Sequence, residues 1–397
     1  MEKKLSIYLD YAAATPMNPQ VLDAMLPYFG ERFANPSAPY SAARAVKTDM
    51  EDARARIAHL IGAKPSNIVF TAGATEANNL AFSAVHPDAH VLTSAIEHES
   101  VLACAKAYDH ALIPVTEQGF VTAEALRDAL TPRTELVSVA LANGEIGTMQ
   151  ALRELAAVLD AERARRLEAG ETRPLYLHTD ASQAAATCMI NISSLNADLI
   201  TISAAKMYGP KQMGMLWAQN GIELRPLIKG GGQESGVRSG TENVAGVVGF
   251  ARAFELARER RKESATRLEQ LRDWLQRELS AAFPWAIITG PSRNTRRLQG
   301  LLHISFPGLE ARRLVLALDQ RGVAVGTGSA CAASKMRTSH VLSAIGMPQD
   351  AADGSLRITL GSPTTREQVE SAARIIIDVV DSECARLHIH SKEHLDG

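Results

Sequence analysis

Short hydrophobic runs separated by amphipathic segments organise the first two-thirds of the chain. The runs are rich in β-branched residues and predict strands at 67–71, 90–94, 111–115, 136–141, 175–180, 199–203 and 213–218. Helix-like segments between them include 123–130 and 151–166. Strand–helix alternation over this length is typical of an α/β protein with a mainly parallel sheet that helices cover on both faces.

The last third has a different pattern and predicts a second, smaller α+β domain. A long, highly charged segment over 247–283 predicts a helix that ends before Pro284. Its apolar positions recur at helical spacing and include Leu268, Leu271, Leu275 and Leu279. Further elements are expected as strands at 301–305, 322–325 and 355–359 and as a final helix at 369–387.

Composition places the chain among ordinary globular proteins. It has 397 residues, of which 46% are hydrophobic and 22% are charged, so a disordered chain is excluded. The 42 Lys and Arg residues nearly balance the 44 Asp and Glu residues, and this leaves no basic excess for direct binding to nucleic acid. No apolar run reaches the roughly 18 residues that a membrane-spanning helix needs, so no membrane association is expected.

Cysteine usage indicates a reducing compartment. Cys104, Cys188, Cys331 and Cys384 are widely spaced and form no C-x-x-C pattern, which argues against a disulfide framework and against a zinc site. The start of the chain lacks the apolar core of a signal peptide, so we expect a cytoplasmic protein with no resident metal. Cys331 lies among small residues over 326–334, and its thiolate is the candidate nucleophile.

Polar residues of reactive types follow several of the predicted strands. Thr75, His98 and Asn143 each come shortly after a strand, Asp180 ends one, and Lys206 comes soon after another. Each of them alone is most simply a solvated loop residue. Because ligands of parallel α/β sheets bind beyond the carboxyl ends of the strands, their shared position predicts a single site.

Together these groups suit a pyridoxal phosphate site. A helix start at 73–76 offers backbone N–H groups and the Thr75 hydroxyl to a phosphate, although the same residues also suit a simple N-cap. Asp180 could pair with a pyridinium nitrogen, and Lys206 could form a Schiff base. His98 could lie over the ring or shuttle protons, or it could be only a capping residue.

Ordered motifs add a resemblance to a known family. They lie at 71–79, 97–98, 143–147, 178–183, 206–211, 238–243 and 328–331. In this order they resemble the NifS/IscS-type cysteine desulfurases, a branch of the class V aminotransferases with the fold type I of pyridoxal-phosphate-dependent transferases. The resemblance extends from Tyr8 to Gly361. It implies a large cofactor-binding α/β domain over 16–262 with a mainly parallel seven-stranded sheet, and a small domain, 1–15 and 263–397, that carries a mobile cysteine loop.

The resemblance also implies how the cofactor would be held. Lys206 would bind pyridoxal phosphate covalently and move protons on the substrate, while His98 would stack on the ring and act as acid and base. Asp180 would pair with the pyridine nitrogen, and Gln183 would bond to the phenolic oxygen. The phosphate ligands would be the Ala74 backbone, Thr75, Ser203 and, from the partner subunit of a homodimer, Thr241.

The implied reaction is the desulfuration of L-cysteine. Asn143, which would also contact the cofactor, and Arg357 would hold the substrate carboxylate. Cys331 would attack the substrate sulfur, giving L-alanine and a persulfide that passes to a sulfur acceptor or an Fe–S scaffold protein. The sulfur would serve iron–sulfur cluster assembly or thiolation, and Cys331 could transiently ligate a nascent cluster.

Some positions depart from the family pattern. Ala205 stands where the family usually has a His that donates to the phosphate, which predicts a bound but more weakly held cofactor. A glycine-rich segment over 230–241 could cradle an anion, but it has Gln233 and Ser235 where His and Arg are frequent. The alternative functions are a selenocysteine lyase, a class V aminotransferase with no use for the Cys331 thiol, and a degenerate non-catalytic subunit.

Overall fold

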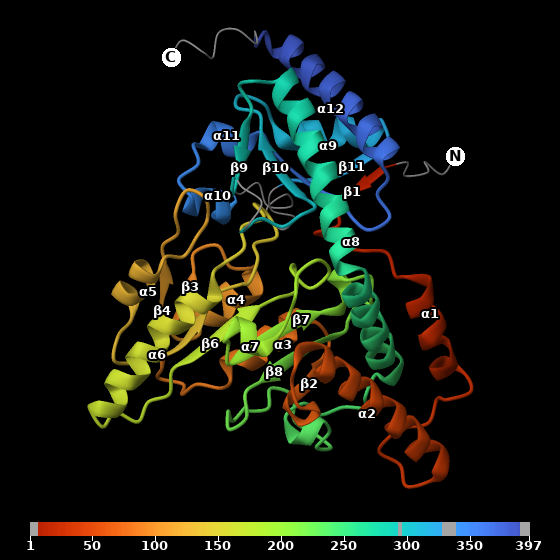
Figure 1. Cartoon of the computed structure of the whole chain (residues 1–397), viewed down its shortest axis with the longest axis vertical. Coiled ribbons are helices and arrows are strands. Elements are labelled where there is room, and N and C mark those ends of the chain that lie inside the picture. Colours follow the sequence, from red (N-terminus) through yellow and green to blue (C-terminus); the bar gives the residue numbers. More distant parts are fainter. Residues whose placement is uncertain (1–6, 293–295, 328–338, 390–397) are drawn as a thin grey trace.

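Two β-sheets, each with its own hydrophobic core, make up the protein. The computed structural model describes residues 7–292, 296–327 and 339–389. A seven-stranded sheet and its helices form the larger part, and a five-stranded sheet lies beyond it (Figure 1). The long helix α8, Val244–Ala282, runs from one part into the other (Figure 1).

The larger sheet is mainly parallel, as predicted. In spatial order its strands are β2 (Ile68–Thr71), β8 (Gly214–Ala218), β7 (Leu199–Ser203), β6 (Tyr176–Asp180), β5 (Thr134–Ser138), β3 (His90–Ser94) and β4 (Asp109–Ile113). Only β8 is antiparallel to its neighbours. The carboxyl ends of the other six strands therefore meet at one edge of the sheet.

Helices cover both faces of this sheet. They are α1 (Pro19–Met25), α2 (Ser41–Ile61), α3 (Ala74–Phe82), α4 (Glu99–Ala105), α5 (Ala123–Ala129), α6 (Leu152–Glu168) and α7 (Ile192–Leu195), with short 3-10 turns η1 (Leu26–Phe29), η2 (Pro65–Asn67), η3 (Ala204–Lys206) and η4 (Glu234–Gly236). Phe70 and Ile200 pack into the core that α2, α6 and α8 share, whereas Val69 and Leu199 pack with α3 and α4 on the opposite face. This alternation follows from the period of two along a strand.

The smaller sheet combines both ends of the chain. Its spatial order is β1 (Ile7–Leu9), β11 (Val323–Thr327), β12 (Ser355–Thr359), β10 (Leu301–Ser305) and β9 (Ile287–Thr289), accompanied by α9 (Ala311–Gln320), α10 (His340–Ala344), α11 (Gln349–Asp353) and α12 (Arg366–Leu387). In α8, Leu256 packs with the first core and Leu268 with the second. The division into domains at residues 15 and 262 stays a prediction, and its second boundary falls inside α8.

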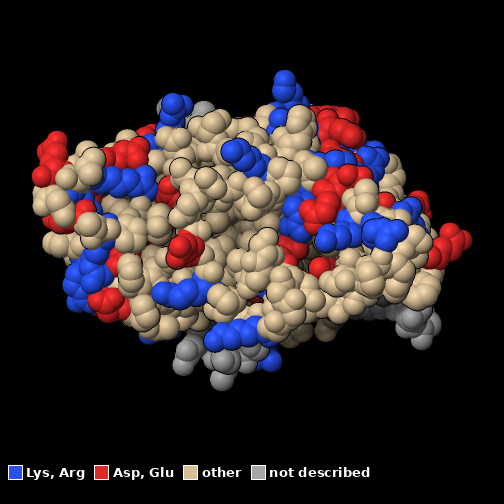
Figure 2. Space-filling view, turned by 90° about the horizontal axis from the view of Figure 1, so that it is seen from below, with Lys and Arg blue, Asp and Glu red and all other residues tan. Residues whose placement is uncertain are grey.

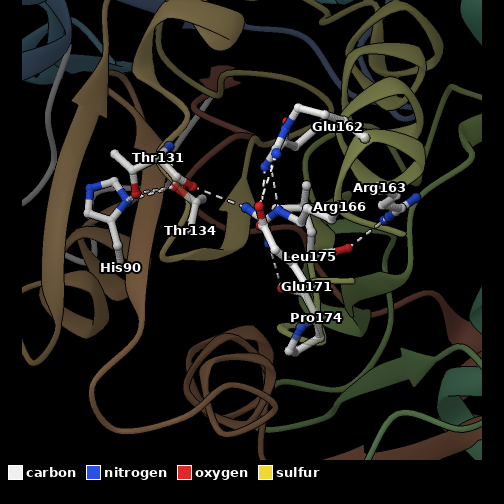
Figure 3. A network of polar contacts seen from close by, with 10 residues as sticks. His90, Thr131, Thr134, Glu162, Arg163, Arg166, Glu171, Pro174 and Leu175 are labelled. Atoms are coloured by element: carbon white, nitrogen blue, oxygen red, sulfur yellow. Dashed lines mark hydrogen bonds and ion pairs between the residues drawn. The ribbon is translucent and has the colours of Figure 1, made fainter. Parts of the chain in front are cut away.

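Polar side chains at the amino edge of the larger sheet have structural partners (Figure 3). His90 Nδ1, at the start of β3, lies 2.8 Å from Thr134 Oγ1 at the start of β5. Arg166, only 2% exposed, donates to the Thr131 carbonyl at 3.1 Å and to Glu162 Oε1 at 2.8 Å. This network joins α6 to the residues at the starts of β3 and β5. Because these polar side chains already bind one another, we expect the reactive groups at the carboxyl edge of the sheet.

The surface carries charges of both signs. On the face shown in Figure 2, basic and acidic side chains are intermixed. Within the described ranges, every helix is too short or too polar to cross a lipid bilayer.

Candidate active site

Five connections at the carboxyl edge of the larger sheet carry the residues predicted from the sequence. Thr75 follows β2 and His98 follows β3. Asn143 follows β5, Asp180 is the last residue of β6, and Lys206 ends the η3 turn after β7. Parallel pairing of β3, β5, β6 and β7 brings four of these connections to adjacent strand ends.

The Lys206 amine is buried and held by the N-terminal segment. Its Nζ donates to the carbonyls of Ala12 at 2.7 Å and Ala13 at 2.8 Å. Burial lowers the pKa of Lys206, and the positive charge of Arg357 lowers it further, while Asp10 and Asp180 act in the opposite direction. A larger share of neutral amine is therefore present near neutral pH, and the neutral amine is the nucleophile.

The Asp180 carboxylate is fixed by two donors. Its Oδ2 accepts from Asn78 Nδ2 at 2.9 Å, and its Oδ1 accepts from the Ser182 backbone N–H at 2.9 Å. Gln183, on the same connection, donates through Nε2 to the Ala12 carbonyl at 3.2 Å. Gln183 therefore shares an acceptor with Lys206, and the structure brings the two predicted residues together.

His98 caps helix α4. Its Nδ1 accepts from the Ser100 backbone N–H at 3.1 Å and lies 2.8 Å from Ser100 Oγ. The capping interpretation and the catalytic one are compatible, because capping uses only Nδ1 and leaves the other ring nitrogen for a ligand.

The amino end of helix α3 forms an open cradle. Gly73, with φ of 117°, is its N-cap, and among the residues that the structure describes no side chain caps the first backbone N–H groups of the helix. A Cβ at Gly214 would lie 2.7 Å from the Gly73 carbonyl carbon, so only a glycine lets β8 approach this turn. Ser203 ends β7 and is buried. The cradle has the positive end of a helix dipole and free donors, which suit a phosphate.

Arg357 reaches the site from the smaller sheet. On β12, its Nη2 donates to Asp10 Oδ1 at 2.9 Å and its Nη1 to the Gly144 carbonyl at 3.3 Å, whereas its buried Nε has no partner within the described chain. Asn143 Oδ1 accepts from the backbone N–H groups of Glu145 and Ile146, and its Nδ2 donates to the Ile96 carbonyl at 2.8 Å. Asn143 therefore joins its own loop to the connection that leads to His98.

Comparisons with known sequences point to one family. The family model described as "Aminotransferase class-V" matches residues 7–371. This chain is a member of that family. The "Cysteine desulfurase IscS" of Clostridium botulinum is 38% identical over 384 residues, which cover 94% of both chains. The protein of the same name from Dictyoglomus turgidum is 39% identical over 388 residues, which cover 95% of both chains.

Solved structures agree with the assignment to the class-V aminotransferase family. A "NIFS-LIKE PROTEIN" superimposes with a TM-score of 0.86 at 32% identity and covers 95% of this chain and 99% of its own. The structure described as "SspA in complex with cysteine" superimposes with a TM-score of 0.74 at 32% identity and covers 89% of this chain and 99% of its own. The predicted fold class and the predicted NifS/IscS-type branch are confirmed.

In this class-V aminotransferase site, position 205 offers no imidazole. Ala205 contributes its carbonyl, which accepts from Thr15 Oγ1 at 2.9 Å. Thr15 Oγ1 in turn accepts from the Tyr208 backbone N–H at 2.9 Å. This pair of bonds joins the turn that carries Lys206 to the N-terminal segment, but it supplies no donor to the phosphate cradle.

Glu97 carries a buried carboxyl group and belongs to the sequence motif at 97–98. Its Oε1 accepts from Ser94 Oγ at 2.5 Å and from the Ala140 backbone N–H at 2.8 Å. Burial raises the pKa of Glu97 to about 8, with a smaller contribution from Asp180. The side chain ties the connection after β3 to the one after β5. Its place directly before His98 was the only signal in the sequence.

The glycine-rich segment is anchored by Glu234. The Glu234 carboxylate pairs with both terminal nitrogens of Arg54, at 2.8 and 2.6 Å, and accepts from the Phe70 backbone N–H at 2.9 Å. Thr241 is the last residue of this segment and is exposed, and among the described residues no hydrogen bond joins it to Lys206. Cys331, the predicted nucleophile, lies outside the described residues.

Proposed function

We propose that the protein is a pyridoxal-phosphate-dependent cysteine desulfurase that converts L-cysteine to L-alanine. The observation that carries the proposal is the electrostatic setting of Lys206. Its buried amine feels the charges of Asp180, which would face a pyridine nitrogen, and of Arg357, which would face a carboxylate. A nucleophilic amine between an acid and a guanidinium is what an amino-acid substrate and this cofactor require.

The residues present fit the cofactor. The uncapped amino end of α3 at Ala74 and Thr75, with Ser203 beside it, would take the phosphate. Asp180 would pair with the ring nitrogen and Gln183 with the phenolic oxygen. When bound, pyridoxal phosphate supplies an electron sink for the substrate carbon. Because Ala205 donates nothing, we expect the phosphate to be held less tightly than where an imidazole contributes.

Side chains of the protein would bind the substrate and transfer its protons. Arg357, whose Nε has no partner among the described residues, would bind the substrate carboxylate, with Asn143 shaping the adjoining loop. Lys206 would take and return the proton of the substrate α-carbon. His98 would hold a proton at the ring nitrogen that does not cap α4.

The Cys331 thiolate would attack the substrate sulfur. A sulfur–sulfur bond forms and the carbon–sulfur bond of cysteine breaks. The products are L-alanine and a persulfide on Cys331, and together they contain the same protons as L-cysteine and the Cys331 thiol. The described chain on both sides of this residue lies close to the site. Gly326 pairs with Arg357 across the sheet, and His340 Nε2 lies 2.9 Å from the Glu97 carbonyl.

We further propose a homodimer that hands sulfur to an acceptor or scaffold protein in the cytoplasm. Thr241 is exposed within its own chain and would reach the phosphate of the partner's site. Large apolar side chains are exposed on α1, η1 and the segment after them, at Leu22, Leu26, Phe29, Phe33 and Tyr40. Such a group of side chains marks an interface. A persulfide carrier also needs reducing surroundings.

The test is alanine formation from L-cysteine, with added cofactor and a thiol reductant. Wild type and Cys384→Ala, whose thiol lies in α12, should both form alanine, whereas Cys331→Ala and Lys206→Ala should not. Alanine formed equally well by Cys331→Ala would overturn the persulfide route. Turnover of another amino acid that survives in Cys331→Ala would indicate an aminotransferase. No product from wild type at saturating cofactor would indicate a non-catalytic subunit.

A further inference from the structure

A chain of hydrogen bonds joins the half-buried Asp180 to the exposed His98 through two residues with no assigned role. Asp180 Oδ2 accepts from Asn78 Nδ2 at 2.9 Å, and the same Nδ2 lies 2.9 Å from Ser100 Oγ. Ser100 Oγ lies 2.8 Å from His98 Nδ1. Asn78 is fully buried in α3, and Ser100 is 9% exposed in the first turn of α4.

The direction of each bond follows from what its atoms can do. An ionised Asp180 only accepts, so the amide nitrogen of Asn78 must face it. That nitrogen carries two protons and can donate to both Asp180 and Ser100. Ser100 Oγ then accepts from Asn78, and its own proton is free to point at His98 Nδ1.

The His98 ring is therefore fixed in one tautomer. Nδ1 accepts from the Ser100 hydroxyl and from the Ser100 backbone N–H, so it carries no proton in the neutral ring. The proton lies on Nε2. This is the ring nitrogen that α4 capping leaves for the cofactor and substrate.

We infer that Asn78 and Ser100 are positioning residues that couple the Asp180 carboxylate to the His98 ring and keep its proton on Nε2. The inference deepens the proposed function and rests on it for the roles of Asp180 and His98. Neither Asn78 nor Ser100 needs to touch the substrate. A change at Asn78 should reach His98, although no hydrogen bond joins the two side chains directly.

The first test observes the ring itself. In histidine-labelled holoenzyme, proton–nitrogen correlation spectra report the tautomer of each ring, and the His98→Gln variant identifies the His98 signals. Ser100→Ala removes one of the two donors that keep the proton off Nδ1. The share of the tautomer with its proton on Nδ1 should rise by roughly twofold to tenfold, the size expected of one neutral hydrogen bond.

The Asn78 variant gives the decisive comparison. Asn78→Ala leaves the Ser100 hydroxyl without its donor and free to turn, so the tautomer ratio of His98 should move in the same direction. The double variant should move no further than Ser100→Ala alone, and Ser100→Thr, which keeps the hydroxyl, should restore the wild-type ratio. Ser83→Ala is the matched control, since its buried hydroxyl donates to the Leu80 carbonyl near the end of α3. An unchanged His98 tautomer ratio in Asn78→Ala would overturn the coupling.

Kinetics supply the second readout. In the variants with a changed His98 tautomer ratio, kcat for alanine formation should fall, while KM for L-cysteine changes little. Because the spectra need no turnover, the two proposals fail separately. A wild-type protein that forms no alanine, with tautomer ratios that change in both variants, would support the coupling and contradict the desulfurase function. Alanine formation by the wild type, with an unchanged tautomer ratio in both single variants, would support the desulfurase function and contradict the coupling.

Discussion

Burial is the main cause of unusual protonation among the residues of the candidate site. It lowers the pKa of Lys206, raises that of Glu97 to about 8 and lowers that of His178 to about 4. His178 lies two residues before Asp180 on β6 and is enclosed by the hydroxyls of Ser138 and Thr201. Each shift favours the neutral form, since charged forms lose solvation in the interior. Near neutral pH the carboxyl edge therefore holds a neutral acid at Glu97 and a neutral imidazole at His178, and the lowered pKa of Lys206 makes its amine easier to deprotonate than that of an exposed lysine.

Glu97 leads to a prediction about stability and pH. Its pKa is about 8 in the folded protein against 4.5 ordinarily. Between these values the unfolded chain loses the proton and the folded chain keeps it, so this carboxyl lowers the free energy of unfolding by about 1.4 kcal/mol per pH unit as pH rises. Glu97→Gln should therefore gain stability relative to wild type from pH 5 to 8, and the difference should be constant above that range.

Urea denaturation at several pH values measures this difference. Glu99→Gln is the control, because Glu99 is two residues away and its side chain is 56% exposed. Its difference from wild type should vary little with pH. A pH-independent difference for Glu97→Gln would mean that the folded protein ionises Glu97 at the usual pH.

At the scale of elements, local patterns predicted most of the strands and fewer of the helices. The apolar runs that became β3 and β7 are buried along their whole length, and β6 is buried except at its two end residues, so hydrophobicity alone locates them. The edge strand β4 lies two residues earlier than predicted, at Asp109–Ile113, because its exposed first residues are polar and pair with β3. The strand β5 likewise begins and ends before the predicted 136–141. Helix α2 and strand β9 were not predicted, since the buried face of α2 mixes three alanines and an arginine with four larger apolar residues and β9 has three residues.

The candidate site was predictable where topology fixes it and unpredictable where side chains meet across the fold. Asp180 and Lys206 lie at adjacent strand ends because β6 and β7 pair in parallel. The bonds that Asn78 makes to Ser100 and Asp180 depend on how α3 and α4 lie over the sheet, and no spacing in the sequence encodes them. The pair Asp10–Arg357 joins residues 347 positions apart, which only the assembled small sheet reveals.

Glu234 should be essential to the segment that carries Thr241. Its carboxylate is 5% exposed and pairs with Arg54, which is 9% exposed. Breaking a buried pair from one side costs about 3–5 kcal/mol where the remaining charge has no other partner. Arg54 keeps its pair with Glu51, so Glu234→Gln should lower the free energy of unfolding by up to about 3 kcal/mol and weaken cofactor binding through displacement of the segment.

Denaturation and cofactor titration test this expectation against Glu51→Gln. Glu51 also pairs with Arg54, but its side chain is 46% exposed, so its loss should cost less than about 1 kcal/mol. Equal effects of the two substitutions would show that the buried pair contributes no more than the exposed one.

Gly214 should be needed for the shape of the phosphate cradle, because its lack of a side chain leaves room for the backbone of Gly73. A Cβ there would lie 2.7 and 2.8 Å from two backbone atoms of Gly73, and backbone cannot move aside as a flexible side chain does. Gly214→Ala should displace the amino end of α3 and weaken cofactor binding roughly tenfold or more, as overpacking of this size costs about 1–3 kcal/mol. Equilibrium dialysis with pyridoxal phosphate measures the change. Gly30→Ala, whose Cβ would meet nothing within 4 Å, should bind the cofactor as wild type does.

At the scale of the whole molecule, the segment after β1 connects the two sheets through the site. Asp10 holds Arg357, the carbonyls of Ala12 and Ala13 hold Lys206, and Thr15 holds the turn at Ala205. The Lys206 amine and the Arg357 guanidinium therefore depend on one stretch of backbone. A rotation of the smaller sheet against the larger one would change both together, which suits a site that must admit a substrate and then close around it.

The last prediction concerns association of two copies. If the exposed apolar segment around Phe29 and Phe33 forms the homodimer interface, wild type should have twice the chain mass of 42.7 kDa in sedimentation equilibrium. The double substitution Phe29→Glu and Phe33→Glu should give monomers, because four charges would then face one another without solvent. Those monomers should also bind pyridoxal phosphate more weakly, since Thr241 would no longer reach a partner's site.

Two further variants separate the interface from the cradle. Leu167→Glu alters an apolar side chain on α6 that is 81% exposed, and it should remain dimeric with unchanged cofactor affinity. Thr241→Ala should remain dimeric but lose affinity, because only the phosphate contact is removed. A monomeric wild type would contradict the proposed dimer. A dimer that survives both Phe substitutions would place the interface on another face, and in that case Thr241→Ala still decides whether this residue supports the cofactor.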